Sequence, residues 1–179
     1  MACFSPDGKR LAASFQGDAS MLFNVENKTN EPIHVFSYPH PLWQYTVSFA
    51  PDGQTCATAC ADQNVYVWSC SHREVLMQLS HSALVFDARF SANGKKILSR
   101  AREGYIRLWN VQNVRSPPLT LPDPENSSAA DVSPDGNWVA TVGGNGLLRI
   151  WAMQRPAAEP FSPPWTPVFN MDRWITTTN

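Results

Sequence analysis

Short apolar runs separated by tight turns follow one another along most of the chain. The most regular turn is a tetrapeptide of the type Ser-Pro-Asp-Gly, in which Pro fixes one φ angle and Gly or Asn accepts a positive one. It occurs at Ser5–Gly8, Ala50–Gly53, Ser91–Gly94 and Ser133–Gly136. Each copy lies between two apolar runs and therefore predicts a β-hairpin. No stretch has the spacing of an amphipathic helix.

The runs around these turns predict four short strands in each repeat. In the second repeat, we expect strands at 46–49, 55–60, 65–68 and 75–79. In the third repeat, we expect them at 85–90, 97–99, 105–109 and 119–121. In the fourth repeat, we expect them at 130–132, 138–142 and 147–151. The pattern is that of an all-β protein.

Two independent markers share one period. The turn tetrapeptides begin 45, 41 and 42 residues apart, and the same intervals separate Phe23, Trp68, Trp109 and Trp151. A period of this length with four strands is typical of a β-propeller blade. The chain therefore resembles WD-repeat proteins over residues 2 to about 154. The resemblance implies four four-stranded antiparallel blades, and it implies an open or partial ring because most propellers of this type use seven blades.

The resemblance also assigns a set of four side chains, here called the tetrad, to each full repeat. It combines a His before the innermost strand, a Ser or Thr, an acid between the second and third strands, and the Trp. The second repeat supplies His40, Thr58, Asp62 and Trp68. The third repeat supplies His81, Ser99, Glu103 and Trp109, with Glu in place of Asp. A buried indole N–H needs an acceptor, and a hydroxyl backed by His and an acid provides one. We expect a structural clamp and not a catalytic triad.

The first and fourth repeats depart from the tetrad. The fourth keeps the hydroxyl and the indole but lacks the His and the acid, with Thr141, Trp151, Asp123 and Asn145 at the four positions. In the first repeat, Phe23 replaces the Trp, and Ser14 and Asp18 are the expected hydroxyl and acid. The resemblance therefore rests on the period and on the two fuller tetrads.

The repeats define the expected domain organisation. We expect one propeller domain over 1–154, divided into blades at 1–36, 37–79, 80–121 and 122–154, and a proline-rich tail over 155–179. One stretch of the tail is a candidate outer strand of the fourth blade, and the tail's Trp165 and Trp174 leave both docking and disorder open.

The first repeat lacks most of its innermost strand, so we expect the C-terminal piece of a longer propeller. An open arc exposes an apolar face at each end. Self-association or further N-terminal blades are therefore expected to cover these faces.

Composition narrows the choice of partners and compartment. The formal net charge is −1, so we expect binding neither to nucleic acid nor to a membrane surface. No export signal and no membrane-spanning apolar run are visible. Four cysteines are too few for a disulfide scaffold of this size, which favours a reducing compartment, and we expect the cytoplasm.

Three patterns that could indicate chemistry are interpreted as structure. The metal-like set is Cys56, Cys60, Cys70 and His72. Residues four apart on one strand are roughly 13 Å apart, too far for a shared zinc ion. The His residues with hydroxyl and acid partners recur together with a Trp, which suits packing better than catalysis. The run Gly143–Gly146 lies between two strands and predicts a hairpin, not a phosphate loop. We expect no enzyme activity, no metal and no cofactor.

The function is expected to lie on the edge of the propeller. Basic residues gather at Lys95, Lys96, Arg100, Arg102 and Arg107, which indicates either a solvated face or a contact with an acidic or phosphorylated partner. Trp43 and Arg102 are placed on a rim, where an exposed Trp beside an Arg has the composition of an interaction hot spot, although Trp43 could equally pack under its loop.

We therefore expect a protein-protein interaction scaffold that binds other proteins or peptides. The alternative is a regulatory or sensor module of a larger enzyme, such as a protein kinase. A weaker possibility is an enzyme with its site at the central channel, where the inward candidates are Asp87, Arg89 and Asp131.

Overall fold

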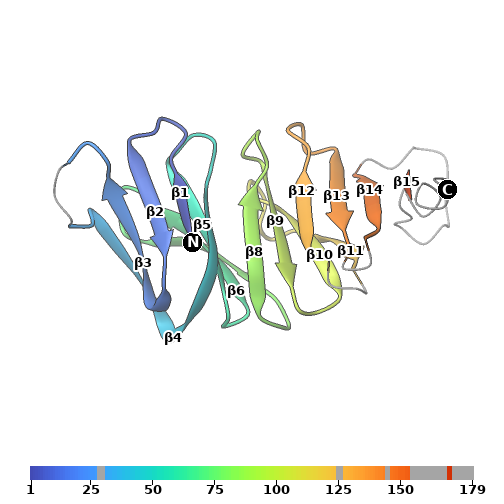
Figure 1. The fold of residues 1–179 in the computed structure, drawn as a ribbon, viewed down its shortest axis with the longest axis horizontal. Coiled ribbons are helices and arrows are strands. Elements are labelled where there is room, and N and C mark those ends of the chain that lie inside the picture. The colour runs from blue at the N-terminus through green and yellow to red at the C-terminus, as the bar shows by residue number, and fades with distance from the viewer. Residues whose placement is uncertain (28–30, 124–126, 144–145, 154–168, 171–179) are drawn as a thin grey trace, which may run out of the picture.

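The computed structural model describes residues 1–27, 31–123, 127–143, 146–153 and 169–170. Every regular element in these residues is a β-strand, which confirms the all-β prediction. The strands form four antiparallel blades that lie side by side in an open arc and do not close into a ring (Figure 1).

Each blade contains four strands in sequence order. Blade 1 contains β1 (Ala2–Phe4), β2 (Arg10–Ser14), β3 (Gln16–Asn24) and the first part of β4 (His34–Phe49). Blade 2 contains the last part of β4, β5 (Thr55–Cys60), β6 (Asn64–Ser69) and β7 (Val75–Ser80). Blade 3 contains β8 (Val85–Phe90), β9 (Lys96–Ala101), β10 (Tyr105–Asn110) and β11 (Leu119–Pro122). Blade 4 contains β12 (Ala129–Val132), β13 (Trp138–Val142), β14 (Leu148–Ala152) and β15 (Phe169–Asn170).

Strand β4 is shared by two blades. It is 16 residues long. Its first part pairs with β3, where Val35 lies opposite Met21, and its last part pairs with β5, where Val47 lies opposite Thr58. Strands β1 to β7 are therefore hydrogen-bonded in one continuous order. The blade boundary predicted after residue 36 falls inside this strand.

The repeated tetrapeptides form the turns between the first and second strands of each blade. Their glycines have φ between 66° and 73°, a range that favours Gly over residues with a Cβ. All four turns lie along one edge of the arc, at the top of Figure 1, here called the turn edge. The opposite edge, here called the rim, carries the loops between the second and third strands and the segments that enter each next blade.

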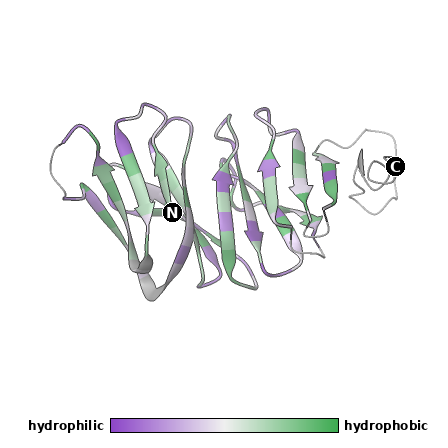
Figure 2. Ribbon diagram, viewed as in Figure 1, coloured by the Kyte–Doolittle hydropathy of each residue, from purple (hydrophilic) through white to green (hydrophobic). Residues whose placement is uncertain are grey.

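One apolar cluster fills each interface between neighbouring blades. Strand β5 shows how: Cys56 and Cys60 belong to the cluster shared with blade 1, whereas Ala57 and Ala59 belong to the cluster shared with blade 3. Successive side chains of a strand point to opposite faces, so the inner strands are apolar on both faces. Hydrophobic residues accordingly occur along the strands of every blade (Figure 2).

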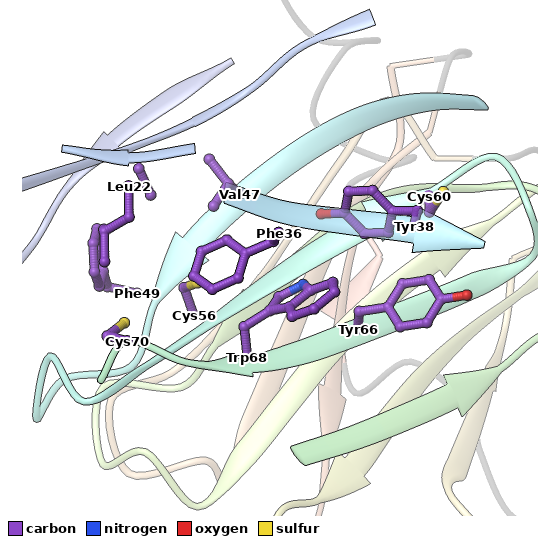
Figure 3. Packing of buried hydrophobic residues seen from close by; sticks show 11 residues of the cluster. Leu22, Phe36, Tyr38, Val47, Phe49, Cys56, Cys60, Tyr66, Trp68 and Cys70 are labelled. Atoms are coloured by element: carbon purple, nitrogen blue, oxygen red, sulfur yellow. The ribbon is translucent and has the colours of Figure 1, made fainter. Parts of the chain in front are cut away.

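Aromatic rings dominate the cluster between blades 1 and 2 (Figure 3). The ring of Trp68 lies 4.9 Å from that of Phe36 and 5.2 Å from that of Tyr38, the latter edge to face. Leu22 from β3 and Cys56 from β5 are buried in the same cluster. The rings fill the space between two sheets that share one continuous strand.

One part of the predicted tail falls within the described residues. Strand β15 pairs with the outer side of β14, where Phe169 lies opposite Ile150, and this confirms the expected outer strand of blade 4. Trp165 and Trp174 lie outside the described residues.

Candidate functional site

The tetrad of the third repeat is assembled at the interface between blades 2 and 3. Nε1 of Trp109 donates to Oγ of Ser99 at 2.7 Å. Nε2 of His81 lies 2.9 Å from the same Oγ, and its Nδ1 lies 2.7 Å from Oε1 of Glu103. The four side chains thus form one chain of hydrogen bonds from the indole to the carboxylate.

Glu103 connects this chain to the rim. Its Oε2 accepts from the backbone N–H of Ser82 at 2.9 Å and from the Ser82 hydroxyl at 2.6 Å. Nε of Arg107 lies 2.7 Å from its Oε1, and the Glu103 side chain is only 3% exposed. The carboxylate therefore fastens the segment that enters β8 to the loop between β9 and β10. Ser82 and Arg107 were not among the predicted tetrad residues.

The pKa values of Glu103 and His81 are shifted by this geometry. Burial acts to raise the pKa of Glu103, but hydrogen bonds from Ser82 and His81 outweigh it and lower the pKa to about 2. Burial lowers the pKa of His81, although Glu103 opposes the change. The side chains of His81 and Ser99 are buried, so neither can reach a substrate. This arrangement supports a clamp.

In the second repeat, the tetrad hydroxyl belongs to Thr58, and a tyrosine as well as the tetrad Trp donates to it. Nε1 of Trp68 donates to Oγ1 of Thr58 at 2.8 Å. The hydroxyl of Tyr38 donates to the same Oγ1 at 2.9 Å, and it lies 2.8 Å from the hydroxyl of Ser20. Burial raises the pKa of Tyr38, which keeps the phenol protonated. Tyr38 and Ser20 were not among the predicted tetrad residues.

The other two predicted members of this tetrad are Asp62 and His40. Oδ2 of Asp62 accepts from the hydroxyl of Tyr66 at 2.7 Å. Asp62 also stabilises its own turn, because its Oδ1 accepts from the backbone N–H of Asn64 at 3.1 Å. The side chain of His40 lies outside the described residues, so its place in the tetrad stays a prediction.

In blade 1, Ala13 lies opposite Met21 just as Thr58 lies opposite Tyr66 in blade 2. Ala13 therefore takes the hydroxyl position, and the assignment of Ser14 was wrong by one residue. The side chain of Asp18 lies outside the described residues.

In blade 4, Nε1 of Trp151 donates to Oγ1 of Thr141 at 3.2 Å. Asp123 is buried and accepts from the backbone N–H and the hydroxyl of Ser127. Asn145 lies outside the described residues.

The predicted rim residues belong to equivalent backbone pairs of neighbouring blades but take different positions in them, because Trp43 corresponds to Leu84 and Arg102 corresponds to Ala61. The carbonyl of Trp43 accepts from the N–H of Ala61, and the carbonyl of Leu84 accepts from the N–H of Arg102 in the same way one blade further on. The side chain of Trp43 is 53% exposed, so it does not pack under its loop. Its ring lies 6.4 Å from that of Tyr45.

The five basic residues do not form one surface. Arg100 is buried, Arg107 is paired with Glu103, and Nζ of Lys96 donates to the carbonyl of Gly136 at 3.4 Å. Arg102 is exposed and makes no ion pair with another described side chain. Alternation along the strands sends these residues to different faces, and of the five, Arg102 is the exposed cation on the rim.

Of the three candidate channel residues, Asp87 and Arg89 form an ion pair on β8, and Asp131 lies on blade 4. Asp87 is buried, with Nε of Arg89 3.1 Å from its Oδ1 and NH2 of Arg100 3.4 Å from its Oδ2. Arg100 also donates to the carbonyl of Ser127 and lies over the ring of Phe86. This network joins blade 3 to blade 4. Asp131 is exposed on blade 4.

The four cysteines are free thiols, and Cys56, Cys60 and Cys70 are buried. Across the described ranges, no three His, Cys, Asp or Glu side chains are grouped so that they could hold a metal ion. In the same part of the chain, no helix is long and apolar enough to cross a membrane.

Comparison with known proteins agrees with this architecture. The family profile WD40, described as WD domain, G-beta repeat, matches residues 30–69, 73–110 and 116–152. The COMPASS component SWD3 of Saccharomyces cerevisiae is 26% identical over 151 residues, which cover 84% of this chain and 47% of the relative. The transcription initiation factor TFIID subunit 5 of Caenorhabditis elegans is 28% identical over 159 residues, which cover 87% of this chain and 24% of the relative.

Among solved structures, the β-propeller domain of Cps50 (Swd1) from Myceliophteria thermophila superimposes with a TM-score of 0.75 at 16% identity. The match covers 84% of this chain and 51% of that domain. This likeness shows the fold. The chain spans about half of the propeller domain of Cps50 and about half of SWD3, and a smaller share of the TFIID subunit.

Proposed function

This chain belongs to the WD40 repeat family, and from that premise we propose that it is a non-catalytic scaffold whose rim binds other proteins or peptides. SWD3 is a component of COMPASS and the nematode relative is a subunit of TFIID, so both are members of multi-protein assemblies. The observation that carries the proposal is the exposed Trp43 on the rim, one blade away from the exposed Arg102.

The chemistry of these two side chains suits recognition. A Trp that is 53% exposed has a large apolar area still to bury, and Trp and Arg are the residue types enriched at interface hot spots. Arg102 brings a planar cation able to bind a carboxylate with two parallel hydrogen bonds. We infer a partner segment that presents an apolar side chain and a nearby acidic side chain.

The clamps beneath the rim support this role. Trp43 precedes the part of β4 that belongs to blade 2, and its carbonyl is held by Ala61 at 2.9 Å. Arg102 directly precedes Glu103, whose carboxylate is held by Ser82 and Arg107. A site whose backbone is already fixed loses less conformational entropy on binding. The buried tetrad thus serves binding indirectly, through the position of the rim.

The test is a quantitative affinity purification with the wild-type chain, Trp43→Ala, Arg102→Glu and a control, Val114→Ala. Val114 is 45% exposed in the loop after β10, on the turn edge. We expect proteins retained by the wild type and by Val114→Ala to fall about tenfold or more with each rim variant, as for a hot-spot residue worth at least ~1.4 kcal/mol. Circular dichroism checks that all variants keep the β-sheet spectrum.

Partners recovered equally by all four proteins would remove Trp43 and Arg102 from the site. A partner lost only with Val114→Ala would move the site to the turn edge. Hydrolysis or group transfer by the purified chain, abolished by a rim variant, would contradict the non-catalytic proposal.

A further inference from the structure

The loop between β6 and β7 of blade 2 contacts blade 1 through Arg73. Nε of Arg73 donates to Nδ1 of His34 at 2.8 Å, and its NH2 donates to the carbonyl of Ile33 at 3.2 Å. His34 is the first residue of β4 and belongs to blade 1. Cys70, at the start of the same loop, is buried in the cluster between these two blades (Figure 3). The loop therefore contributes a buried contact and an exposed contact between blades 1 and 2.

The exposed contact requires His34 to be neutral. A guanidinium has N–H donors and no acceptor, so Nδ1 of His34 has to be an unprotonated acceptor. Among the described residues, the charged and titratable groups that act on the imidazole are Arg73 and His72, both from this loop. Burial lowers the pKa of His34, and both side chains lower it further, while the backbone of Cys70 acts to raise it. These surroundings favour the imidazole without its second proton.

The backbone of Arg73 is held in an unfavourable conformation. Its φ is 53°, in the left-handed region that residues with a Cβ rarely adopt. Such a conformation persists where the surrounding contacts outweigh its cost. Within the loop, Oγ of Ser69 accepts from the backbone N–H of His72 at 3.1 Å, which orders the turn but does not tie it to blade 1. Residues 71–74 are exposed, so the tie to blade 1 in this stretch comes from the guanidinium of Arg73.

We propose that His34 and Arg73 form a pH-sensitive latch, which holds the loop between β6 and β7 against blade 1 while His34 is neutral and releases it when His34 binds a proton. A proton on Nδ1 replaces the acceptor by a donor and places a positive charge beside the guanidinium. The contact is complete above pH 6.5, the ordinary pKa of the imidazole, and weakens as the pH falls below that value. The latch lies on the turn edge, where the N–H of Cys70 donates to the carbonyl of Gln54, and is independent of what the rim binds.

The test compares amide hydrogen exchange of the full chain at about pH 7.5 and about pH 5.5, corrected for the intrinsic pH dependence of exchange. Protection of Ile33 and of residues 70–72 should fall by up to about tenfold, the limit for a contact that is lost when an imidazole of pKa 6.5 binds a proton. Strand β13 of blade 4 is the internal reference and should keep its protection. In His34→Gln, the amide can still accept from Arg73 but does not titrate, so the loop should be equally protected at both pH values.

Two further variants make the test specific for the latch. His72→Gln removes the other histidine of this region and is the matched control, which should keep the wild-type response to pH. Arg73→Gln removes the guanidinium and is expected to raise the pKa of His34, measured by an NMR titration of the imidazole. A wild-type or His72→Gln loop that is equally protected at both pH values would overturn the proposal. A response that survives in His34→Gln, a pKa of His34 that Arg73→Gln leaves unchanged, or an equal loss of protection in β13 would also overturn it.

Discussion

Ser99 receives hydrogen-bonding partners from two sides inside the interface between blades 2 and 3. The indole of Trp109 donates to its Oγ, and the ring of His81 lies within hydrogen-bonding distance of it. Thr58 takes the equivalent role in blade 2, with Trp68 and Tyr38 as its donors. Because all these groups are buried, each lost partner leaves a polar atom without water to replace it. A few hydroxyls therefore decide whether the large Trp rings can be buried at all.

The first prediction concerns Ser99. Ser99→Ala leaves Nε1 of Trp109 without its acceptor and is expected to lower the free energy of unfolding by ~1–3 kcal/mol. Ser99→Thr keeps a hydroxyl at a position where blades 2 and 4 use Thr58 and Thr141, and it should lose much less. Urea denaturation of the three proteins measures the difference. Equal losses for the Ala and Thr variants would mean that volume, not the hydrogen bond, decides.

The second prediction concerns pH. The pKa of Glu103 is lowered from 4.5 to about 2 in the folded protein, so the unfolded chain binds a proton on this group more readily. The stabilisation from its carboxylate is therefore complete above pH 4.5 and is lost as the pH falls toward 2. It amounts to at most about 3 kcal/mol.

The measurement compares Glu103→Gln with the wild type in urea denaturation between pH 7 and pH 3. The gap in unfolding free energy should narrow as the pH falls. Glu26→Gln is the matched control, because the Glu26 carboxylate is exposed and forms a long ion pair, 3.7 Å, with the exposed Lys9. Such a surface pair contributes little to stability. A gap for Glu103→Gln that stays constant with pH would show that the shifted pKa does not contribute to stability.

The residue-scale details were only partly predictable. Spacing from Trp109 identified Ser99, because the strands of the third repeat have the regular length. The same spacing, ten residues before the Trp position, leads to Ala13 in the first repeat, whereas Ser14 is only nine residues before Phe23 and was assigned because it carries the hydroxyl. Tyr38 was missed because the spacing of the repeat markers does not show that β4 begins as early as His34 and carries Tyr38 into the interface. The aromatic alternation of Phe36 and Tyr38 was the available signal.

At the scale of elements, each inner strand must satisfy two neighbours at once. Strand β9 presents Ile97 and Ser99 to blade 2 and Leu98 to blade 4. Its Arg100 pairs with Asp87 of the neighbouring strand β8 and also reaches toward blade 4, where it donates to the carbonyl of Ser127. Strand positions followed from turns and apolar runs, since both are local. The continuity of β4 and the contact of Arg100 with the carbonyl of Ser127 depend on the packing of whole blades, which no local pattern encodes.

The third prediction tests the ion pair between Arg100 and Asp87. Arg100→Leu leaves the buried Asp87 with only Arg89, whose side chain is 49% exposed, and should cost ~2–4 kcal/mol of unfolding free energy. Adding Asp87→Ala removes the unpaired charge and should recover at least half of the loss. Thermal and urea denaturation of the single and double variants measure this coupling. A double variant less stable than Arg100→Leu would contradict the role of Asp87 as the stranded partner.

At the scale of the whole molecule, cohesion comes from three separate clusters, one between each pair of neighbouring blades. In the described part of the chain, the apolar clusters join each blade to the blades beside it, so the stability is close to a sum of nearest-neighbour terms. Among the described residues, blades 1 and 4 have one face packed against a neighbouring blade, and blades 2 and 3 have two. Blade 4 is therefore expected to open before blades 2 and 3 do.

The fourth prediction uses this order. Trp151→Ala removes a buried ring from the cluster between blades 3 and 4, a change of the kind that costs ~3–5 kcal/mol. Amide hydrogen exchange in β12, β13 and β14 should accelerate by roughly a hundredfold or more, while exchange in β5 and β6 stays unchanged. Trp68→Ala is the counterpart, expected to expose β2 and β3 but not β13. Acceleration spread evenly over all blades by either variant would show one cooperative unit instead.

Strand β4 joins blades 1 and 2 directly, without a loop between them, so a pulling force is transmitted from one blade to the other along a single strand. Its 16 residues run from the outer border of blade 1 to the inner border of blade 2. A tensile force along the chain in this region would shear the ladders to β3 and β5 together, whereas blades joined by loops can be peeled off one at a time. Under pulling, blades 1 and 2 would therefore behave as a single stiff segment, with the weaker joints further along the arc.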